Sequence, residues 1–235
     1  MPTLPKITAW SFSRWNEYMG CPYKSKLKVI DKLKEPGSVA MDRGTELHKH
    51  CENYLRGLTK TIHKDVKPIA AELKDLKKRG ALAEAEFTFR KDWSATGWFD
   101  KDAWCRVKAD ATISPILDAD KPVVEVHDFK SGGKMEADGS VVGKPEYPLQ
   151  LELYALAGLL TYPLAMSAKT SLIFIDHGKV VVTTDEYLQK DVNLLKKTWE
   201  QRTKKMLSDT KFKPTPGNAC RWCHFSKSRG GCCVY

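Results

Sequence analysis

Two short segments of the sequence place carboxylates at the ends of apolar runs, one of them next to a lysine. Asp110 ends the run that begins at Ala103, and Asp128 and Lys130 end the run that begins at Pro122. Alternate residues of a strand share a face, so Asp128 and Lys130 point to the same side. If the two strands are neighbours, Asp110 and Asp128 converge beside the ammonium group. Oxygen ligands suit Mg²⁺ or Mn²⁺, so these residues predict a site for a hard divalent cation.

The lysine beside such a cation has a chemical use of its own. Lys130 could orient or deprotonate a metal-bound water and neutralise charge on a phosphorane-like transition state. Glu86, on the strand before the one that carries Asp110, could support the metal through a water. The alternative is an exposed Asp–Lys ion pair at a strand end, because Asp-x-Lys is a common sequence.

Two pairs of residues at helical spacing favour the catalytic interpretation. His48 follows Gly44 by four residues, which places both on one face of a helix, and a histidine can ligate a metal through a ring nitrogen. His50 fits a solvated histidine better. Gln150 and Tyr154 also lie four apart on an otherwise apolar helix, where polar groups need partners. These two side chains could reach a phosphate or the lysine.

Seven cysteines, an odd number, favour metal or cluster ligation over a disulfide framework. Cys220 and Cys223 form a C-x-x-C, Cys232 and Cys233 follow, and Cys21 lies about 200 residues earlier. Tetrahedral thiolate sites suit either Zn²⁺ or an iron–sulfur cluster. The ligands could all be C-terminal, or Cys21 could join Cys220, Cys223 and one of the last two cysteines. The spacing leaves both arrangements and both metals open.

Hydrophobic periodicity predicts the elements that position these residues. Helices are expected over 11–20, 38–57, 66–79, 148–160 and 187–208, and strands over 85–90, 103–113, 122–130, 170–176 and 179–184. Ser11 or Ser13 should cap the first helix, and Gly80 should follow the third. Cys51 and Cys105 fall within these elements and are expected to be core thiols. The order ααα-βββ-α-ββ-α predicts an α/β fold with a mixed central β-sheet flanked by helices.

Composition narrows the class of protein further. The chain has 235 residues, 42% of them hydrophobic, which excludes wholesale disorder. Its formal net charge is +10, and residues 187–235 hold 11 Lys+Arg against 3 Asp+Glu, which favours a polyanionic partner such as nucleic acid. The sequence shows neither an apolar run of about 20 residues nor a secretory h-region. We therefore expect no membrane segment and a cytoplasmic location.

The order of these motifs resembles a known family. Cys-Pro, Gly-x-x-x-His, Asp, Asp-x-Lys, Gln-x-x-x-Tyr, C-x-x-C and a last Cys, spread from Ser11 to Cys233, are similar to the PD-(D/E)XK nucleases of the RecB type. The likeness is greatest to CRISPR-associated RecB-like exonucleases and their phage-encoded relatives. Two features depart from that pattern: Asp128 stands where relatives often have Glu, and the gap from Cys223 to the final cysteine is longer than usual.

The resemblance implies a set of functional residues on a restriction-endonuclease-like core. Mg²⁺ or Mn²⁺ would be held by His48, Asp110, Asp128 and the backbone carbonyl of Phe129, with Lys130, Gln150 and Tyr154 as further catalytic residues. A 4Fe-4S cluster would be held by Cys21, Cys220, Cys223 and Cys233 or Cys232. Residues 1–235 would form a single nuclease domain: a helical part (1–80), a catalytic α/β core (81–185), and a basic helix with a cysteine-rich tail (186–235) that closes on Cys21.

The function implied is that of a metal-dependent DNA nuclease, most of all a single-strand exonuclease, in some relatives with endonuclease activity, acting in recombination, repair or DNA processing. Its partners would be DNA that is single-stranded or has free ends, and proteins of recombination or replication; a phage-encoded protein would act in the host cytoplasm. The basic residues expected along the DNA path are Lys196, Lys197, Arg202, Lys204, Lys205, Arg221, Lys227 and Arg229. Two alternatives are a non-catalytic, zinc-containing DNA-binding module and a vestigial nuclease subunit of a larger complex.

Overall fold

The computed structural model of the chain describes residues 5–182 and 186–235, which form two compact units. One unit is Val39–Lys197, and the other combines Met1–Ser38 with Thr198–Tyr235. The helix α6 (Val192–Ser208) begins in the first unit and ends in the second. Among the described residues, no helix combines the length and the apolar character needed to cross a bilayer.

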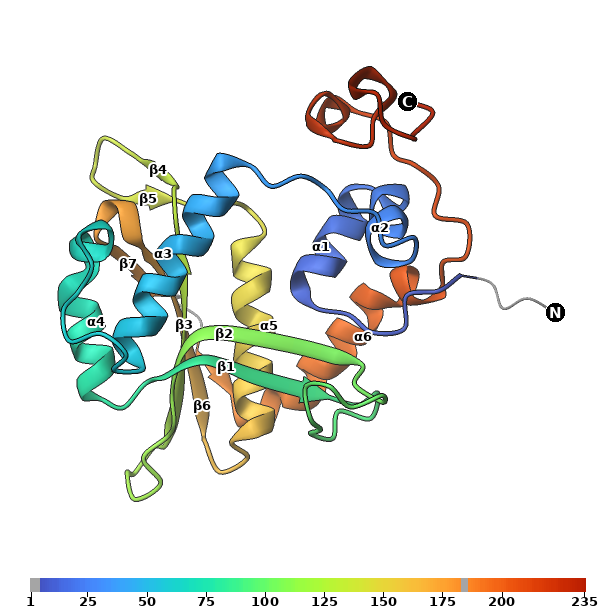
Figure 1. Ribbon diagram of the computed structural model, residues 1–235. Coiled ribbons are helices and arrows are strands. Elements are labelled where there is room, and N and C mark those ends of the chain that lie inside the picture. The colour runs from blue at the N-terminus through green and yellow to red at the C-terminus, as the bar shows by residue number, and fades with distance from the viewer. Residues whose placement is uncertain (1–4, 183–185) are drawn as a thin grey trace. The chain divides into compact units, whose positions relative to one another are not determined.

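A six-stranded sheet forms the centre of the Val39–Lys197 unit (Figure 1). Its strands follow the order β1 (Leu82–Phe89), β2 (Cys105–Ile113), β3 (Val123–Lys130), β6 (Ser167–Phe174) and β7 (Lys179–Val182), and β8 (Tyr187–Leu188) pairs with β6. Neighbouring strands are antiparallel except β3 and β6, which are parallel. Parallel neighbours need a crossover connection, and the helix α5 (Tyr147–Thr161) supplies it. The mixed sheet with helices on both faces confirms the predicted fold class.

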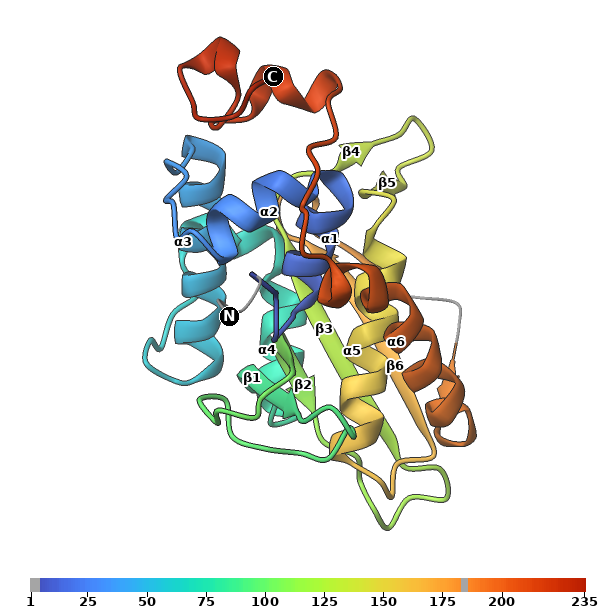
Figure 2. The same ribbon diagram turned by 90° about the vertical axis from the view of Figure 1, so that its right-hand side faces the viewer.

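One face of the sheet is covered by α3 (Val39–Leu55), the 3₁₀ turn η1 (Lys64–Ile69) and α4 (Ala70–Lys78). Figure 2 shows α3 and α4 on one side of β3 and α5 on the other. The buried core between these helices and the sheet includes Leu47, Cys51, Leu73, Ile113, Phe129 and Ile173. The thiol of Cys51 is fully buried, and burial raises its pKa to about 12, as expected for a core thiol.

The other face is covered by α5, which is buried on most sides and is therefore apolar almost all round. Gly158 lets this helix approach β3 closely, because a Cβ at that position would lie 3.2 Å from Val124 Cγ1 and 3.4 Å from Val126 Cγ2. The close approach fixes the height of α5 above the strand that carries Asp128 and Lys130.

The sheet opens into a fork at Asp110. Strand β2 pairs with β3 over only three residues, from Ala111 with His127 to Ile113 with Glu125, whereas it pairs with β1 along nearly its whole length. On the Asp110 side of Ala111 the strands β2 and β3 separate, as Figure 1 shows. On the other side of β2, the pairing with β1 is interrupted opposite Asp110. The residue of β1 at that position is Glu84, whose φ of +57° is left-handed. A non-glycine residue in that region is uncommon and costs about 1–2 kcal/mol.

Aromatic side chains form the core of the unit that contains both chain ends. The rings of Trp10 and Trp199 stack at 5.6 Å, and Trp15 meets Trp199 edge-on at 5.4 Å. Trp15 Nε1 donates to the carbonyl of Arg202 at 3.0 Å, and the Tyr18 hydroxyl donates to Asp209 at 2.8 Å. Trp15 and Tyr18 of α1 (Phe12–Gly20) thus contact α6 and the residue that directly follows it.

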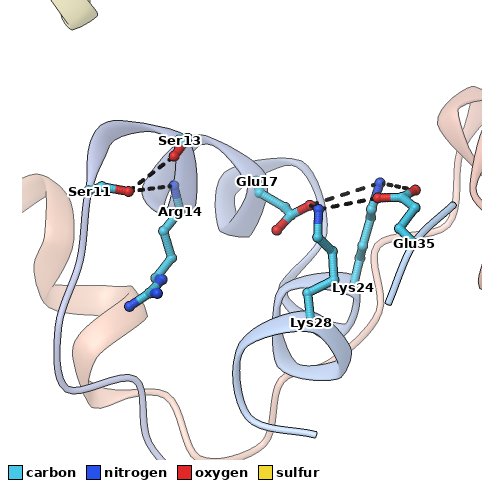
Figure 3. Close-up of polar contacts among 7 residues, drawn as sticks. All are labelled: Ser11, Ser13, Arg14, Glu17, Lys24, Lys28 and Glu35. Atoms are coloured by element: carbon cyan, nitrogen blue, oxygen red, sulfur yellow. Dashed lines mark hydrogen bonds and ion pairs between the residues drawn. The ribbon is translucent and has the colours of Figure 1, made fainter. Parts of the chain in front are cut away.

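The junction between α1 and α2 (Pro22–Val29) is held by an ion-pair network (Figure 3). Lys28 Nζ lies 2.6 Å from Glu17 and 3.2 Å from Glu35, and Lys24 Nζ lies 2.8 Å from Glu35. Burial alone would raise the pKa of Glu35, but the two lysines outweigh it and lower that pKa. The network spans the turn at Cys21.

Most predicted elements are confirmed to within a few residues, including the Ser11 cap of α1 and Gly80 after α4 with a φ of +74°. The helix predicted over 66–79 is instead a 3₁₀ turn followed by α4, because Pro68 has no N–H and Ile69 leaves the helical angles. The helix predicted from 187 begins at Val192. Residues 187 and 188 pair with β6 instead.

Two further differences concern short elements. The sequence did not predict α2, whose first residue is Pro22, a position where the missing N–H costs nothing. The small hairpin of β4 (Lys134–Met135) and β5 (Val141–Val142) was also not predicted. Of the strand predicted over 179–184, residues 183 and 184 lie outside the described residues.

Gly158→Leu should lower the free energy of unfolding by about 1–3 kcal/mol, because the added side chain would force α5 away from β3. Thr161→Leu, on the exposed end of the same helix, should change it by about 0.5 kcal/mol or less. Chemical denaturation of both variants measures the difference. Equal stability of the two variants would contradict the close packing of α5.

Candidate active site

The residues singled out in the sequence converge where β2 leaves β3. Asp110 comes from β2, Asp128 and Lys130 from β3, His48 from α3, and Gln150 and Tyr154 from α5. The last paired residues of the two strands are Ala111 and His127, so the next position of the register sets Asp110 beside Asp128. All these residues belong to the Val39–Lys197 unit.

Asp110 connects the helix α3 to the end of β3. Its Oδ1 lies 3.0 Å from His48 Nδ1, and its Oδ2 accepts a hydrogen bond of 2.6 Å from the Phe129 backbone N–H. Burial lowers the pKa of His48, but the hydrogen bond and negative charge of Asp110 outweigh burial and raise that pKa above its ordinary value. The Asp110 contact thus fixes the orientation of the His48 ring and of the Phe129 backbone.

Glu84 is a third acidic residue of this site that the sequence did not reveal. Ligand atoms of His48, Glu84 and Asp110 lie within 4.8 Å of one another. The register of β1 and β2 explains this, because the pairs on either side, Ala83 with Ala111 and Ala85 with Ala109, place Glu84 opposite Asp110. The predicted acid, Glu86, is exposed and lies opposite Lys108. Only the strand register distinguishes the two glutamates.

A closed ring of polar contacts joins β3 to α5. Lys130 Nζ forms an ion pair with Asp128 Oδ2 and donates to Gln150 Oε1 at 3.0 Å. Gln150 Nε2 donates to the Tyr154 hydroxyl at 2.8 Å, and that hydroxyl lies 3.4 Å from Asp128 Oδ1. Gln150 and Tyr154, one helical turn apart, therefore hold the Lys130 ammonium and the Asp128 carboxylate in fixed positions relative to each other.

Asp128 is only 3% exposed, and burial raises its pKa to about 7, against the opposing effect of the Lys130 charge. Burial also raises the pKa of Tyr154 well above its ordinary value, so the hydroxyl keeps its proton and can donate to the carboxylate. An ionised Asp128 in this position needs positive charge nearby. The Lys130 ammonium supplies it in the ion pair, and a divalent cation would add to it and favour the ionised carboxylate further.

The aromatic ring of Tyr147 packs against the side chain of Lys130. Lys130 Nζ lies 4.7 Å from the centre of the Tyr147 ring, in cation–π contact. The ring in turn packs against the chain at Gly143, where a Cβ would come within 2.5 Å of Tyr147 Cδ2. Lys130 therefore has three fixed neighbours: Asp128, Gln150 and the Tyr147 ring.

A groove with a volume of about 1140 Å³ opens onto these residues. Its lining includes His48, Glu84, Asp110, Phe129, Lys130 and Lys144. Carboxylates, one imidazole and a backbone carbonyl form the donor set expected for Mg²⁺ or Mn²⁺. The residues present thus fit a hard divalent cation, and the groove has room for a phosphodiester beside it.

The C-terminal cysteines share one small loop. Cys223 N donates to the Cys220 carbonyl at 3.2 Å, and Cys233 N donates to the Phe225 carbonyl at 2.8 Å. Gly231 passes so close to the Phe225 backbone that a side chain there would collide with it. Cys21 lies between α1 and α2. Within residues 5–182 and 186–235, no three cysteine sulfurs lie within 4.8 Å of one another.

The basic residues predicted to follow DNA fall in both units. Lys197, Lys204, Lys205, Arg221, Lys227 and Arg229 are exposed, and Lys196 and Arg202 are partly buried. The Arg202 guanidinium lies over the Trp199 ring at 4.9 Å.

A family model described as the PD-(D/E)XK nuclease superfamily matches residues 9–121 and 106–228. Among solved structures, a protein from Eubacterium rectale described as a "putative exonuclease" is 14% identical over 92% of this chain and 88% of its own, with a TM-score of 0.54. LHK-Exo, solved with dAMP, is 12% identical over 88% of this chain and 91% of its own, with a TM-score of 0.44. No curated protein matches this chain. At these identities, structural similarity bears on the fold alone.

The mixed sheet flanked by helices is consistent with a restriction-endonuclease-like fold. The chain belongs to the PD-(D/E)XK nuclease superfamily, because the family model covers most of its length. Membership implies hydrolysis of phosphodiester bonds.

Glu84→Gln should weaken Mn²⁺ binding by roughly 10- to 100-fold, because it removes a charged oxygen beside His48 and Asp110. Glu86→Gln is the matched control, since it removes the same charge two residues along the same strand, and it should leave the affinity unchanged. Titration calorimetry with Mn²⁺ measures both. An equal loss of Mn²⁺ affinity in the two variants would show that Glu84 contributes only its negative charge and is not a ligand.

Proposed function

We propose that this protein is a metal-dependent DNA nuclease of the RecB-like type, acting on single strands from a free end. The observation that carries the proposal is the closed ring of Asp128, Lys130, Gln150 and Tyr154, whose lysine lines the same open groove as His48 and Asp110. A structural ion pair at a strand end would need neither the two helical partners nor the groove.

Mg²⁺ or Mn²⁺, held by His48, Asp110, Asp128 and the Phe129 carbonyl with Glu84 close by, would activate water and stabilise the charge that develops on phosphate and leaving oxygens. Lys130 stands beside this position with its Nζ held by Asp128 and Gln150. Its ammonium can orient the attacking water and offset negative charge in the transition state. Gln150 and Tyr154 keep the ammonium from turning away when substrate binds.

DNA as the substrate is supported by the net charge of +10 and by the exposed lysine at the groove, Lys144. The exonuclease activity and the preference for single strands rest on the motif order shared with RecB-like nucleases. Digestion of end-labelled DNA with 5′- and 3′-blocked substrates, single- and double-stranded, tests both and gives the polarity. Cleavage of circular single strands, which have no free end, would show that the protein is an endonuclease and not an exonuclease.

A 4Fe-4S cluster on Cys21, Cys220, Cys223 and Cys233 belongs to the same proposal. Three of these cysteines share the C-terminal loop, and the backbone bond between Cys233 and Phe225 orders that loop next to the C-x-x-C. Cys232 is exposed, whereas Cys233 is partly buried, which favours Cys233 as the last ligand. The sulfurs are not gathered as closely as the shell of one zinc ion requires, with Zn–S bonds of about 2.3 Å.

Asp128→Asn and Lys130→Gln should each lower Mg²⁺-dependent DNA degradation by roughly 10²- to 10⁴-fold, because each removes a charge at the reacting phosphate. Lys134→Gln, an exposed lysine in β4, is the control and should keep full activity. Circular dichroism checks that all three variants fold. Full activity of the first two variants would rule out the proposed catalytic site, whereas a lack of cleavage by the unaltered protein would leave the chain as a DNA-binding module or a vestigial subunit.

Protein purified without air should contain iron and absorb broadly in the visible range. Cys233→Ser should lose this absorbance, and Cys232→Ser should keep it. Iron analysis of the two variants discriminates the fourth ligand. Stoichiometric zinc without iron in the unaltered protein would refute the cluster.

A further inference from the structure

A second group of metal-ligating side chains lies outside the catalytic residues. Ligand atoms of His50, His63 and Asp65 lie within 4.8 Å of one another. His50 belongs to α3, His63 caps η1, and Asp65 lies within η1. The group thus joins two elements that are separated by a loop of eight residues (56–63).

The two imidazoles stack face to face, with ring centres 3.6 Å apart and planes inclined by 10°. His50 Nε2 is buried and has no hydrogen-bond partner among the described residues. Buried ring nitrogens normally have such a partner, so this one is unusual. The sequence suggested a solvated histidine at this position, but the side chain is only 21% exposed.

Two carboxylates flank the stacked rings at a distance too long for a good hydrogen bond. His63 Nδ1 lies 3.5 Å from Asp65 Oδ2, and His50 Nε2 lies 3.6 Å from Glu46 Oε1. Ligands about 2.0–2.1 Å from one tetrahedral ion are separated by about 3.4 Å, so both distances match an edge of such a shell. These two pairs have the spacing of ligands to one ion, and an ion on His63 Nδ1 would replace the 3.4 Å hydrogen bond that this nitrogen accepts from the Asp65 backbone N–H.

We propose that His50, His63 and Asp65, with Glu46 as the fourth ligand, form a second metal site that binds Zn²⁺ or a similar transition-metal ion. Two imidazoles with carboxylates suit such ions, whereas the His48 group, with one imidazole among oxygen donors, suits Mg²⁺ or Mn²⁺. In the stacked arrangement the nitrogen lone pairs run side by side, so binding requires the rings to tilt toward a common point. His63 is 40% exposed and Glu46 is 67% exposed, which leaves both side chains room to turn.

The second site has contacts of its own, although both groups use α3 and His50 and Glu46 also line the groove. Residues two apart on a helix point about 200° apart around its axis, so His48 and His50 face different neighbours. His48 contacts Asp110, and His50 contacts His63. An ion on the second site would tie η1 to α3 and would close the loop between them.

Zinc stoichiometry tests the proposal without reference to nuclease activity. Titration calorimetry with ZnCl₂ should find one equivalent fewer in His63→Ala than in the unaltered protein. His177→Ala, a histidine of the same unit outside both groups, should keep the full number, which separates the site from adventitious binding to histidine. Because the cysteines and catalytic residues are the same in all three proteins, their own zinc binding cancels in the comparison.

Asp65→Asn keeps the shape of the side chain, so it tests the site even if His63→Ala fails to fold. It should weaken the same zinc-binding step at least tenfold. Zn²⁺ should also raise the melting temperature of the unaltered protein more than that of His63→Ala. X-ray absorption at the zinc edge should assign only nitrogen and oxygen ligands to the additional ion. Equal zinc stoichiometry in His63→Ala and His177→Ala would overturn the proposal.

Discussion

The buried carboxylate of Asp128 governs how the elements around it must be arranged. A charge removed from water costs several kcal/mol unless its surroundings replace the lost hydration. Lys130 and Tyr154 supply that replacement, and Gln150 links the two. Because Gln150 and Tyr154 lie on α5, the helix must rest directly on β3, and Gly158 permits the approach. Packing of the core and geometry of the site therefore depend on each other.

The fork in the sheet is the second condition for the site. In a continuous antiparallel pair, the backbone groups of both strands would bond to each other. Where β2 leaves β3, the N–H of Phe129 is instead bound by the Asp110 carboxylate. On the other side of β2, the left-handed conformation of Glu84 interrupts the pairing with β1 opposite Asp110. This strained residue lies beside His48 and Asp110, and strained backbone often occurs at functional sites.

The helix α3 contributes to two sites because of its own geometry. Its apolar residues, such as Leu47 and Cys51, face the core, and polar residues occupy the remaining directions. His48 is directed to the fork, and His50 is directed to the turn at His63. Any change that rotates this helix would therefore disturb the contacts of His48 at the groove and the histidine pair together.

Local patterns in the sequence were sufficient for the elements and for part of the site. Alternation placed Asp128 and Lys130 on one face, helical spacing paired Gln150 with Tyr154, and Ser11 and Gly80 marked helix ends, because these are properties of neighbouring residues. The short strand at Tyr187 was missed because pairing with β6, a non-local contact, outweighs the helical pattern of the residues that follow.

The sequence by itself determined which residue types were available for metal-dependent chemistry and which secondary structure carried them. Tertiary structure alone decided that Glu84 rather than Glu86 stands beside Asp110, and that His50 stacks on His63. Strand register and the meeting of distant segments caused both outcomes. A shift of two residues leaves the alternation of a strand unchanged, so the pattern alone could not distinguish the glutamates.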